Sequence, residues 1–213
     1  LKIIGVKNGD EVLMPSLNFV ASGNAVKYCN AIPHFVEIDD KTLGIDPTKL
    51  KIYLNRIVVR KKNFSYNKHT NRRISCIIPM HIFGHPSNVI KIKEITNNFN
   101  ITMVEDAAEA LGSLYKKKHL GTFGKIGILS FNGNKIITTG GGGAILTNDP
   151  SIAKRAKYLT TIAKIPHKWK YEFSEVGYNY RMPGINAALG CAQINRLNEY
   201  VDSKRKLFKK YKK

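Results

Sequence analysis

The segment MVEDAAEALGS, residues 103–113, carries an apolar strand into a turn of small residues. We predict the strand over residues 101–105, so that Glu105 and Asp106 stand where it ends. In open parallel sheets, ligands bind beyond the carboxyl ends of the strands. The segment therefore predicts a strand that delivers acidic side chains to a binding edge. Taken alone, Asp106 is equally well explained as the cap of a following helix.

Strand and helix signals alternate on both sides of this segment. Such alternation predicts an α/β layered domain with a largely parallel sheet. The further predicted strands are residues 10–15, 32–38, 74–79, 126–131 and 143–147. The predicted helices are residues 18–28 with Asn18 as cap, 91–99, 150–160, and one long helix from Pro183 with a buried stripe of Ile185, Leu189, Ala192, Leu197 and Val201.

A second informative segment, LSFNGNKIITTGGGGAI at residues 129–145, places Lys135 between a predicted strand and four glycines. A lysine attacks carbonyl groups when burial or nearby cations and dipoles lower its pKa. Glycines 140–143 permit positive φ and close approach of the backbone. Taken alone, these features are better explained by a surface lysine and a flexible turn.

A third segment, EVGYNYRMPG at residues 175–184, contains Asn179 and Arg181 two positions apart. Residues two apart in an extended segment share a face. An amide beside a guanidinium suits an anionic oxygen ligand, because the guanidinium makes paired hydrogen bonds. An ordinary structural salt bridge is the alternative.

The chain is strongly basic, with a formal net charge of +20 over 213 residues. The charges are spread along the chain, with one cluster in residues 56–73, where Phe64 and Tyr66 are interleaved, and another in residues 204–213. A basic nucleic-acid-binding α/β module is therefore an alternative function. We favour a solvated surface, because charge alone does not identify a binding fold.

The three cysteines, Cys29, Cys76 and Cys191, are far apart and lack metal-ligand spacing. We expect buried thiols in a reducing cytoplasm, with neither a disulfide nor a metal site. No apolar run reaches the length needed to cross a bilayer, so we expect a cytoplasmic protein without a membrane partner.

The three segments, in this order, resemble the DegT/StrS family of nucleotide-sugar aminotransferases. The resemblance extends to GDEVLMPSLNFVASGNAV at residues 9–26, PHFVEID at 33–39 and PMHIFGHP at 79–86, and covers nearly the whole chain. It looks closest to the subgroup that makes legionaminic-acid-type 4-amino sugars.

The resemblance implies the large domain of a type I transferase that depends on pyridoxal phosphate (PLP), aspartate aminotransferase-like, with a mostly parallel seven-stranded sheet between helices. Residues 1–200 would form this domain, and residues 201–213 a basic helical tail leading to a small C-terminal domain. An upstream phosphate-cup segment and that small domain are expected to be absent. We therefore predict that the chain binds PLP weakly and turns over little substrate.

The resemblance also assigns roles to individual residues. Lys135 would form the Schiff base and act as general base, and Asp106 would hold the pyridine nitrogen. The other cofactor residues would be Glu109 beside the ring or its hydroxyl, Ser130 at the phosphate, Phe19 stacked on the ring, and Asn179 at the phosphate of the neighbouring subunit. On the substrate side would lie Arg181 and His81, although a loop-ordering histidine is the simpler interpretation.

The predicted function is transfer of an amino group from glutamate onto a nucleotide-linked 4-keto-deoxy sugar in surface polysaccharide biosynthesis. Because Asn179 would serve the neighbouring chain, the resemblance implies a homodimer. Two alternatives stay open: the basic nucleic-acid-binding module, and a catalytically inactive relative that acts as a partner.

Overall fold

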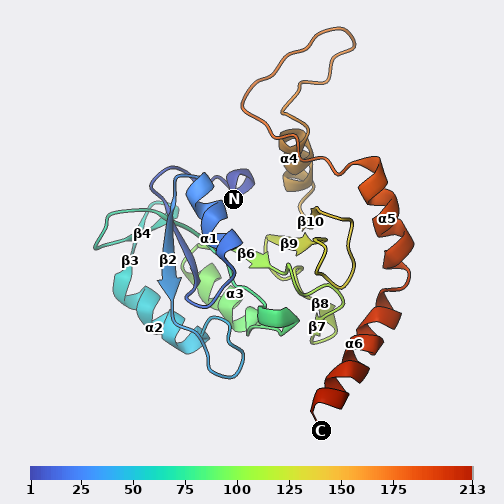
Figure 1. Ribbon diagram of the computed structural model, residues 1–213. Coiled ribbons are helices and arrows are strands. Elements are labelled where there is room, and N and C mark those ends of the chain that lie inside the picture. The colour runs from blue at the N-terminus through green and yellow to red at the C-terminus, as the bar shows by residue number, and fades with distance from the viewer. Residues whose placement is uncertain (213) are drawn as a thin grey trace. The chain divides into compact units, whose positions relative to one another are not determined.

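The computed structural model describes residues 1–212, and its contacts divide the chain into two units, Leu1–Leu129 and Ser130–Lys213. The elements of the first unit are β1 Glu11–Pro15, α1 Val20–Tyr28, β2 Ile32–Val36, α2 Pro47–Ile57, β3 Val58–Lys61, β4 Phe64–Asn67, β5 Ile74–Ile77, α3 Val89–Asn98, β6 Thr102–Asp106, β7 Leu114–Tyr115, β8 Lys118–His119 and β9 Ile126–Ser130, with 3-10 turns η1 Lys2–Ile4 and η2 Ile82–Gly84. The second unit adds β10 Gly143–Leu146, α4 Pro150–Thr160, α5 Gly184–Ile194 and α6 Leu197–Tyr211. Figure 1 shows these elements along the chain.

The main sheet has six strands in the order β10-β9-β6-β5-β1-β2 among the residues described, so the expectation of seven is wrong for this chain. The pairs β1–β2, β1–β5, β5–β6 and β6–β9 are all parallel, as the alternation of strands and helices predicted. Their carboxyl ends therefore meet along one edge, where the turns after β1, β5 and β6 begin.

β1 lies inside the first unit and is buried on both faces. Val12 and Met14 pack in one cluster with Val26 of α1, while Leu13 points to the opposite face because strand side chains alternate. A strand buried on both sides reads as a continuous apolar run, as in VLMP here.

The helix α2 and the two hairpins β3–β4 and β7–β8 were not predicted. The helix α2 begins at Pro47, and the Asp46 carboxylate accepts hydrogen bonds from the amides of Thr48 and Lys49 at 2.8 and 3.1 Å. An acidic cap followed by proline at the first helical position is the sequence signal for this start. The antiparallel hairpin β3–β4 follows directly and carries much of the basic cluster at residues 56–73.

The predicted long helix from Pro183 is two helices in the structure, because α5 ends at Ile194 and α6 begins at Leu197. The predicted buried stripe is also wrong: none of the described residues of α5 and α6 is buried, and Ile185 is 88% exposed. The predicted tail lies within α6 as far as Tyr211, and its last residue falls outside the residues described.

The cysteines divide into two buried thiols and one exposed thiol. Cys29 and Cys76 are buried as expected, and burial raises the pKa of the Cys76 thiol to about 12. Cys191 on α5 is exposed, so the expectation that it is buried is wrong. Among the described helices, none is long and apolar enough to span a bilayer.

Candidate active site

Asp106 is the last residue of β6, and the structure holds its carboxylate at the carboxyl edge of the sheet. Its Oδ2 accepts a hydrogen bond of 2.5 Å from the Ser22 hydroxyl of α1, and its Oδ1 accepts one of 3.1 Å from the Ala108 amide. The segment that follows is a turn, so the alternative that Asp106 caps a helix is wrong. A half-buried carboxylate with two partners retains lone pairs for a further N–H donor.

The neighbouring Glu105 points into the protein and is fully buried, because successive strand residues face opposite sides. Its oxygens accept hydrogen bonds from the amides of Gly121, Phe123 and Gly124 at 2.9, 2.6 and 2.5 Å, and from the His81 ring at 3.1 Å. Burial alone would raise the pKa of Glu105, but the His81 and backbone hydrogen bonds outweigh it and hold that pKa below its ordinary value.

His81 links the loop after β5 to this buried carboxylate. Its Nε2 lies 3.1 Å from a Glu105 oxygen, and its Nδ1 lies 3.3 Å from both the amide and the hydroxyl of Ser87. A carboxylate can only accept, so Nε2 carries a proton that it donates to Glu105. Both ring nitrogens are engaged inside the protein, and this burial favours the loop-ordering interpretation over a substrate contact.

The turn at residues 82–84 contacts Glu109 through its backbone and exposes an aromatic ring. The Glu109 carboxylate accepts a hydrogen bond of 3.0 Å from the Phe83 amide. Phe83 has φ 51° and is 81% exposed, a backbone conformation that costs free energy for a bulky residue. At the following Gly84, a Cβ would lie 2.7 Å from the Glu109 carbonyl oxygen, so only glycine fits. Phe83 is a candidate site residue that the sequence did not reveal.

Phe19 immediately precedes α1 and presents its ring at the same edge of the first unit. The ring is 66% exposed, and the Phe19 amide donates to the Met80 sulfur at 3.4 Å. This contact joins the turn after β1 to the loop that carries His81. The first unit thus brings Phe19, Asp106, His81 and Glu109 onto the loops of one sheet edge.

In the second unit, Lys135 lies in a turn that follows β9. The Lys135 amide donates to the Asn132 carbonyl at 3.0 Å, and the Ser130 hydroxyl accepts from the Asn132 amide at 3.4 Å. Ser130 and Lys135 are therefore brought into one turn. Lys135 is neither fully buried nor fully exposed.

Two amides of α5 hold the glycine-rich loop beyond Lys135, and the sequence did not predict them. The Gln193 side chain accepts from the Thr138 amide at 3.0 Å and donates to the Thr138 carbonyl at 2.9 Å. The Asn186 side chain donates to the Thr139 carbonyl at 2.5 Å. Asn186 and Gln193 are seven residues apart, which is two helical turns and places them on one face of α5. This spacing is the signal by which the sequence could have indicated a shared contact.

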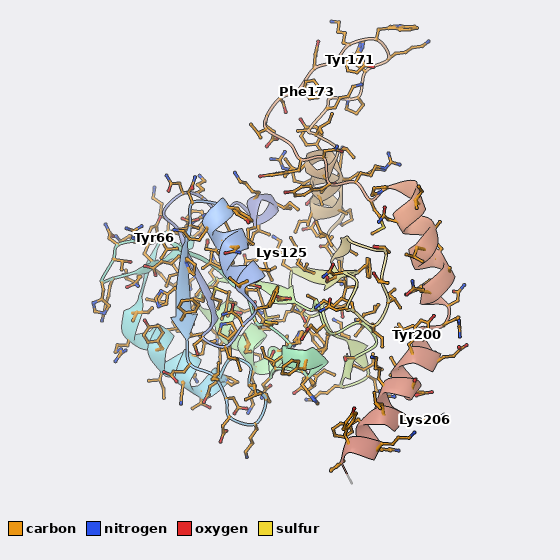
Figure 2. The ribbon with its side chains drawn as sticks, in the orientation of Figure 1. Tyr66, Lys125, Tyr171, Phe173, Tyr200 and Lys206 are labelled. Carbon is orange, nitrogen blue, oxygen red and sulfur yellow. The ribbon has the colours of Figure 1, made fainter. Side chains whose placement is uncertain are left out.

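Asn179 and Arg181 lie on the extended segment before α5, and both are exposed. Asn179 forms an antiparallel bridge with Thr161, which fixes its backbone beside the end of α4. Figure 2 labels Tyr171 and Phe173 on the long loop between α4 and this segment, where both rings are exposed. The predicted pairing of Asp106 with Lys135 across one ring stays a prediction.

The model of the DegT/DnrJ/EryC1/StrS aminotransferase family matches residues 1–213. The chain belongs to this family. Its members are PLP-dependent sugar aminotransferases, so the family-level prediction is confirmed.

The relatives match all or nearly all of this chain but only part of their own length. The GDP-perosamine synthase of Escherichia coli O157:H7 is 38% identical over 213 residues, which are 100% of this chain and 54% of that protein. The GDP-perosamine synthase of Caulobacter vibrioides is 37% identical over 207 residues, 97% of this chain and 51% of that protein. The chain thus spans about half the length of the curated relatives it matches.

Solved structures of aminotransferases share the fold. The aminotransferase TlmJ from Streptoalloteichus hindustanus has a TM-score of 0.84 at 27% identity, over 99% of this chain and 53% of that one. The predicted α/β fold of a type I PLP aminotransferase is therefore confirmed, with six strands in place of seven.

The residues of this family member fit pyridoxal phosphate. Asp106 keeps acceptor capacity for a protonated ring nitrogen, and the exposed Phe19 ring offers a flat apolar face. Ser130 and Lys135 supply a hydroxyl and a primary amine from one turn. This donor set matches the parts of the cofactor in chemical type.

Proposed function

We propose that this chain supplies the cofactor-binding residues of an aminotransferase that moves an amino group from glutamate onto a nucleotide-linked 4-keto-deoxy sugar for surface polysaccharide. The observation that carries the proposal is Asp106 at the end of β6, ordered by Ser22 and Ala108, in a chain that matches the family along its whole length. The two relatives named GDP-perosamine synthase support a nucleotide-sugar substrate. The legionaminic-acid subgroup stays a prediction.

Asp106 and Phe19 would hold the cofactor ring from one edge of the first unit. When bound, pyridoxal phosphate supplies a ring that accepts electrons from the carbon carrying the amino group. The ionised Asp106 carboxylate would keep the ring nitrogen protonated, which that electron flow needs. Its bonds from Ser22 and Ala108 fix the carboxylate, so little reorganisation is required.

Lys135 would carry the proton-transfer chemistry. Its Nζ would hold the cofactor, and its free amine would accept and donate a proton at the substrate carbon as a general base. Gln193 and Asn186 would support this indirectly, because they hold the loop that follows Lys135. Ser130 would contact the cofactor phosphate. Glu109 would lie beside the cofactor ring, held there by the hydrogen bond from the Phe83 amide.

We further propose that the protein works as a cytoplasmic homodimer in which Asn179 reaches the phosphate of the neighbouring chain. The exposure of Asn179 and Arg181, with a backbone fixed by the Thr161 bridge, supports this role. The exposed rings of Tyr171 and Phe173 and the apolar Ile185 offer surface that a second copy would cover.

The decisive experiment is covalent trapping of the cofactor. We expect borohydride reduction in the presence of pyridoxal phosphate, followed by peptide mass mapping, to modify Lys135 selectively. Lys135→Arg should abolish the specific adduct, whereas Lys154→Arg, a change at an exposed lysine of α4, should leave it intact. Asp106→Asn should reduce the yield, because a neutral amide no longer favours the protonated ring nitrogen.

Two outcomes would contradict the proposal. Adducts scattered over surface lysines, with no preference for Lys135, would favour the inactive relative. Tight binding to nucleic acid that weakens steeply with salt, without any Lys135 adduct, would favour the basic module.

A further inference from the structure

A pocket of about 430 Å³ lies in the first unit, between the end of β2 and one face of α2. We call it the β2–α2 pocket. Ser16, directly after β1, lines it together with the end of β2, so it opens at the carboxyl ends of these two strands. Figure 1 shows α2 beside β2. None of the residues predicted to hold the cofactor lines this pocket.

One face of α2 gives the pocket an apolar centre between two cations. Lys49, Ile52, Tyr53 and Arg56 line it and follow the spacing i, i+3, i+4, i+7, which places them on one helical face. Across from them, Phe35 of β2 is 57% exposed, and Ile52 itself is 65% exposed. Apolar side chains left open beside cations suit a ligand with a flat apolar part and an anionic part.

A chain of hydrogen-bonded polar groups, anchored on the buried Glu11, holds the Tyr53 wall in place. The Tyr53 hydroxyl lies 2.8 Å from His34 Nε2, and His34 Nδ1 lies 2.8 Å from the Glu11 carboxylate. Glu11 in turn accepts from Asn67 at 3.0 Å and from Thr70 at 2.5 Å. Because each member is fixed by the next, the Tyr53 ring is pre-organised before any ligand arrives.

The two cations differ in how much positive charge they can offer. Lys49 lies 3.6 Å from the carboxylate of Glu37, which also lines the pocket. The Arg56 guanidinium lies 5.4 Å from the Tyr53 ring centroid and has no acidic partner among the residues described. A guanidinium stacked on an aromatic ring binds phosphate in paired hydrogen bonds, so Arg56 is the anion contact.

We infer that the β2–α2 pocket binds a nucleoside phosphate, with the base against Phe35, Ile52 and Tyr53 and the phosphate on Arg56. A base supplies the flat apolar ring, and its phosphate supplies the anion. The nucleotide comes either from a nucleotide sugar, if the proposed function holds, or from a free nucleotide. The site itself does not depend on the amino-transfer chemistry.

The test is calorimetric titration of the full chain with GDP and UDP. We expect binding that Arg56→Gln weakens about tenfold or more, because the charged phosphate contact is lost. Ile52→Glu should abolish binding by placing a carboxylate on the exposed wall, and Tyr53→Phe should weaken it a few-fold through loss of the His34 anchor. Arg60→Gln on β3 removes an exposed cation that does not line the pocket and should change nothing.

Three outcomes would overturn the assignment. These are no binding by the unaltered chain at millimolar nucleotide, binding equally tight in Arg56→Gln, and binding of ribose 5-phosphate as tight as that of GDP. Competition between GDP and a GDP-sugar would identify the nucleotide-sugar source, and independent binding of the two would identify a free nucleotide. Trapping of the cofactor at Lys135 is a separate experiment. A failure of nucleotide binding can therefore be told apart from a failure of the proposed function.

Discussion

Glu11 and Glu105 are two buried carboxylates at opposite ends of strands in the same sheet, and they are satisfied in different ways. Glu11 opens β1 and takes its hydrogen bonds from the side chains of His34, Asn67 and Thr70. Glu105 near the end of β6 takes three of its four from backbone amides. Both carboxyl groups keep a pKa below the ordinary value, because these hydrogen bonds outweigh the effect of burial.

The difference shows how rigidly each neighbourhood is built. Side-chain donors such as Thr70 can rotate away to water, whereas the amides of a loop cannot leave without rearranging the chain. At Gly124, a Cβ would lie 2.7 Å from the Met103 carbonyl oxygen, so the loop that donates to Glu105 is packed against β6 itself. Glu105 and the groups that donate hydrogen bonds to it form a rigid hub. This hub stands next to Asp106, where the placement of a carboxylate matters most for the proposed chemistry.

The largest expected effect is the loss of the rigid hub. Glu105→Ala leaves three loop amides and His81 without their acceptor, and we expect it to lower the free energy of unfolding by about 3–5 kcal/mol. Glu11→Ala should cost roughly 1–3 kcal/mol, because two of its donors, His34 and Thr70, lie nearer to solvent. Urea unfolding followed by circular dichroism measures both. Equal losses would show that the backbone donors of Glu105 add no rigidity.

The next effect is a pH-dependent stabilisation that both carboxylates share. The folded pKa of each carboxyl lies below its ordinary value of 4.5, so their stabilisation is present above pH 4.5 and is lost as the pH falls through the lowered pKa. Each group should add a slope of up to about 1.4 kcal/mol per pH unit in that window. The measurement is the free energy of unfolding from pH 7 to 3 in the unaltered chain, Glu105→Gln and Glu11→Gln. Each variant should flatten the curve, and an unchanged acid limb in both would refute the assignment.

The smallest expected effect comes from removing one of the side-chain donors that bind Glu11. Thr70→Val removes the hydroxyl that binds Glu11 at 2.5 Å and should cost about 1 kcal/mol. Thr70→Ser keeps the hydroxyl and is the matched control. A loss larger than that of Glu11→Ala would mean that Thr70 acts through contacts other than this hydrogen bond.

Much of the sheet and the helix α4 were predictable from local pattern. The strands β1, β2, β5, β6 and β9 lie within one or two residues of the predicted ranges, and α4 matches its prediction. The failures have physical reasons. Apolar residues of the α5 segment recur at helical spacing whether or not anything covers them, so periodicity could not tell that Ile185 is exposed. The break between α5 and α6 contains neither proline nor glycine, the usual signals of a helix end.

The sequence by itself determined the alternation of strands and helices, the family, and the chemical types of residue that stand at Asp106, Ser130 and Lys135. These follow from local runs of residues, which are visible along the chain. The tertiary structure alone decided that Glu105 faces inward to the loop amides, that His81 serves Glu105, and that Glu11, His34 and Tyr53 form one hydrogen-bonded chain beside the β2–α2 pocket. Such contacts join residues far apart in sequence, and their formation depends on the path of the whole chain rather than on any local pattern.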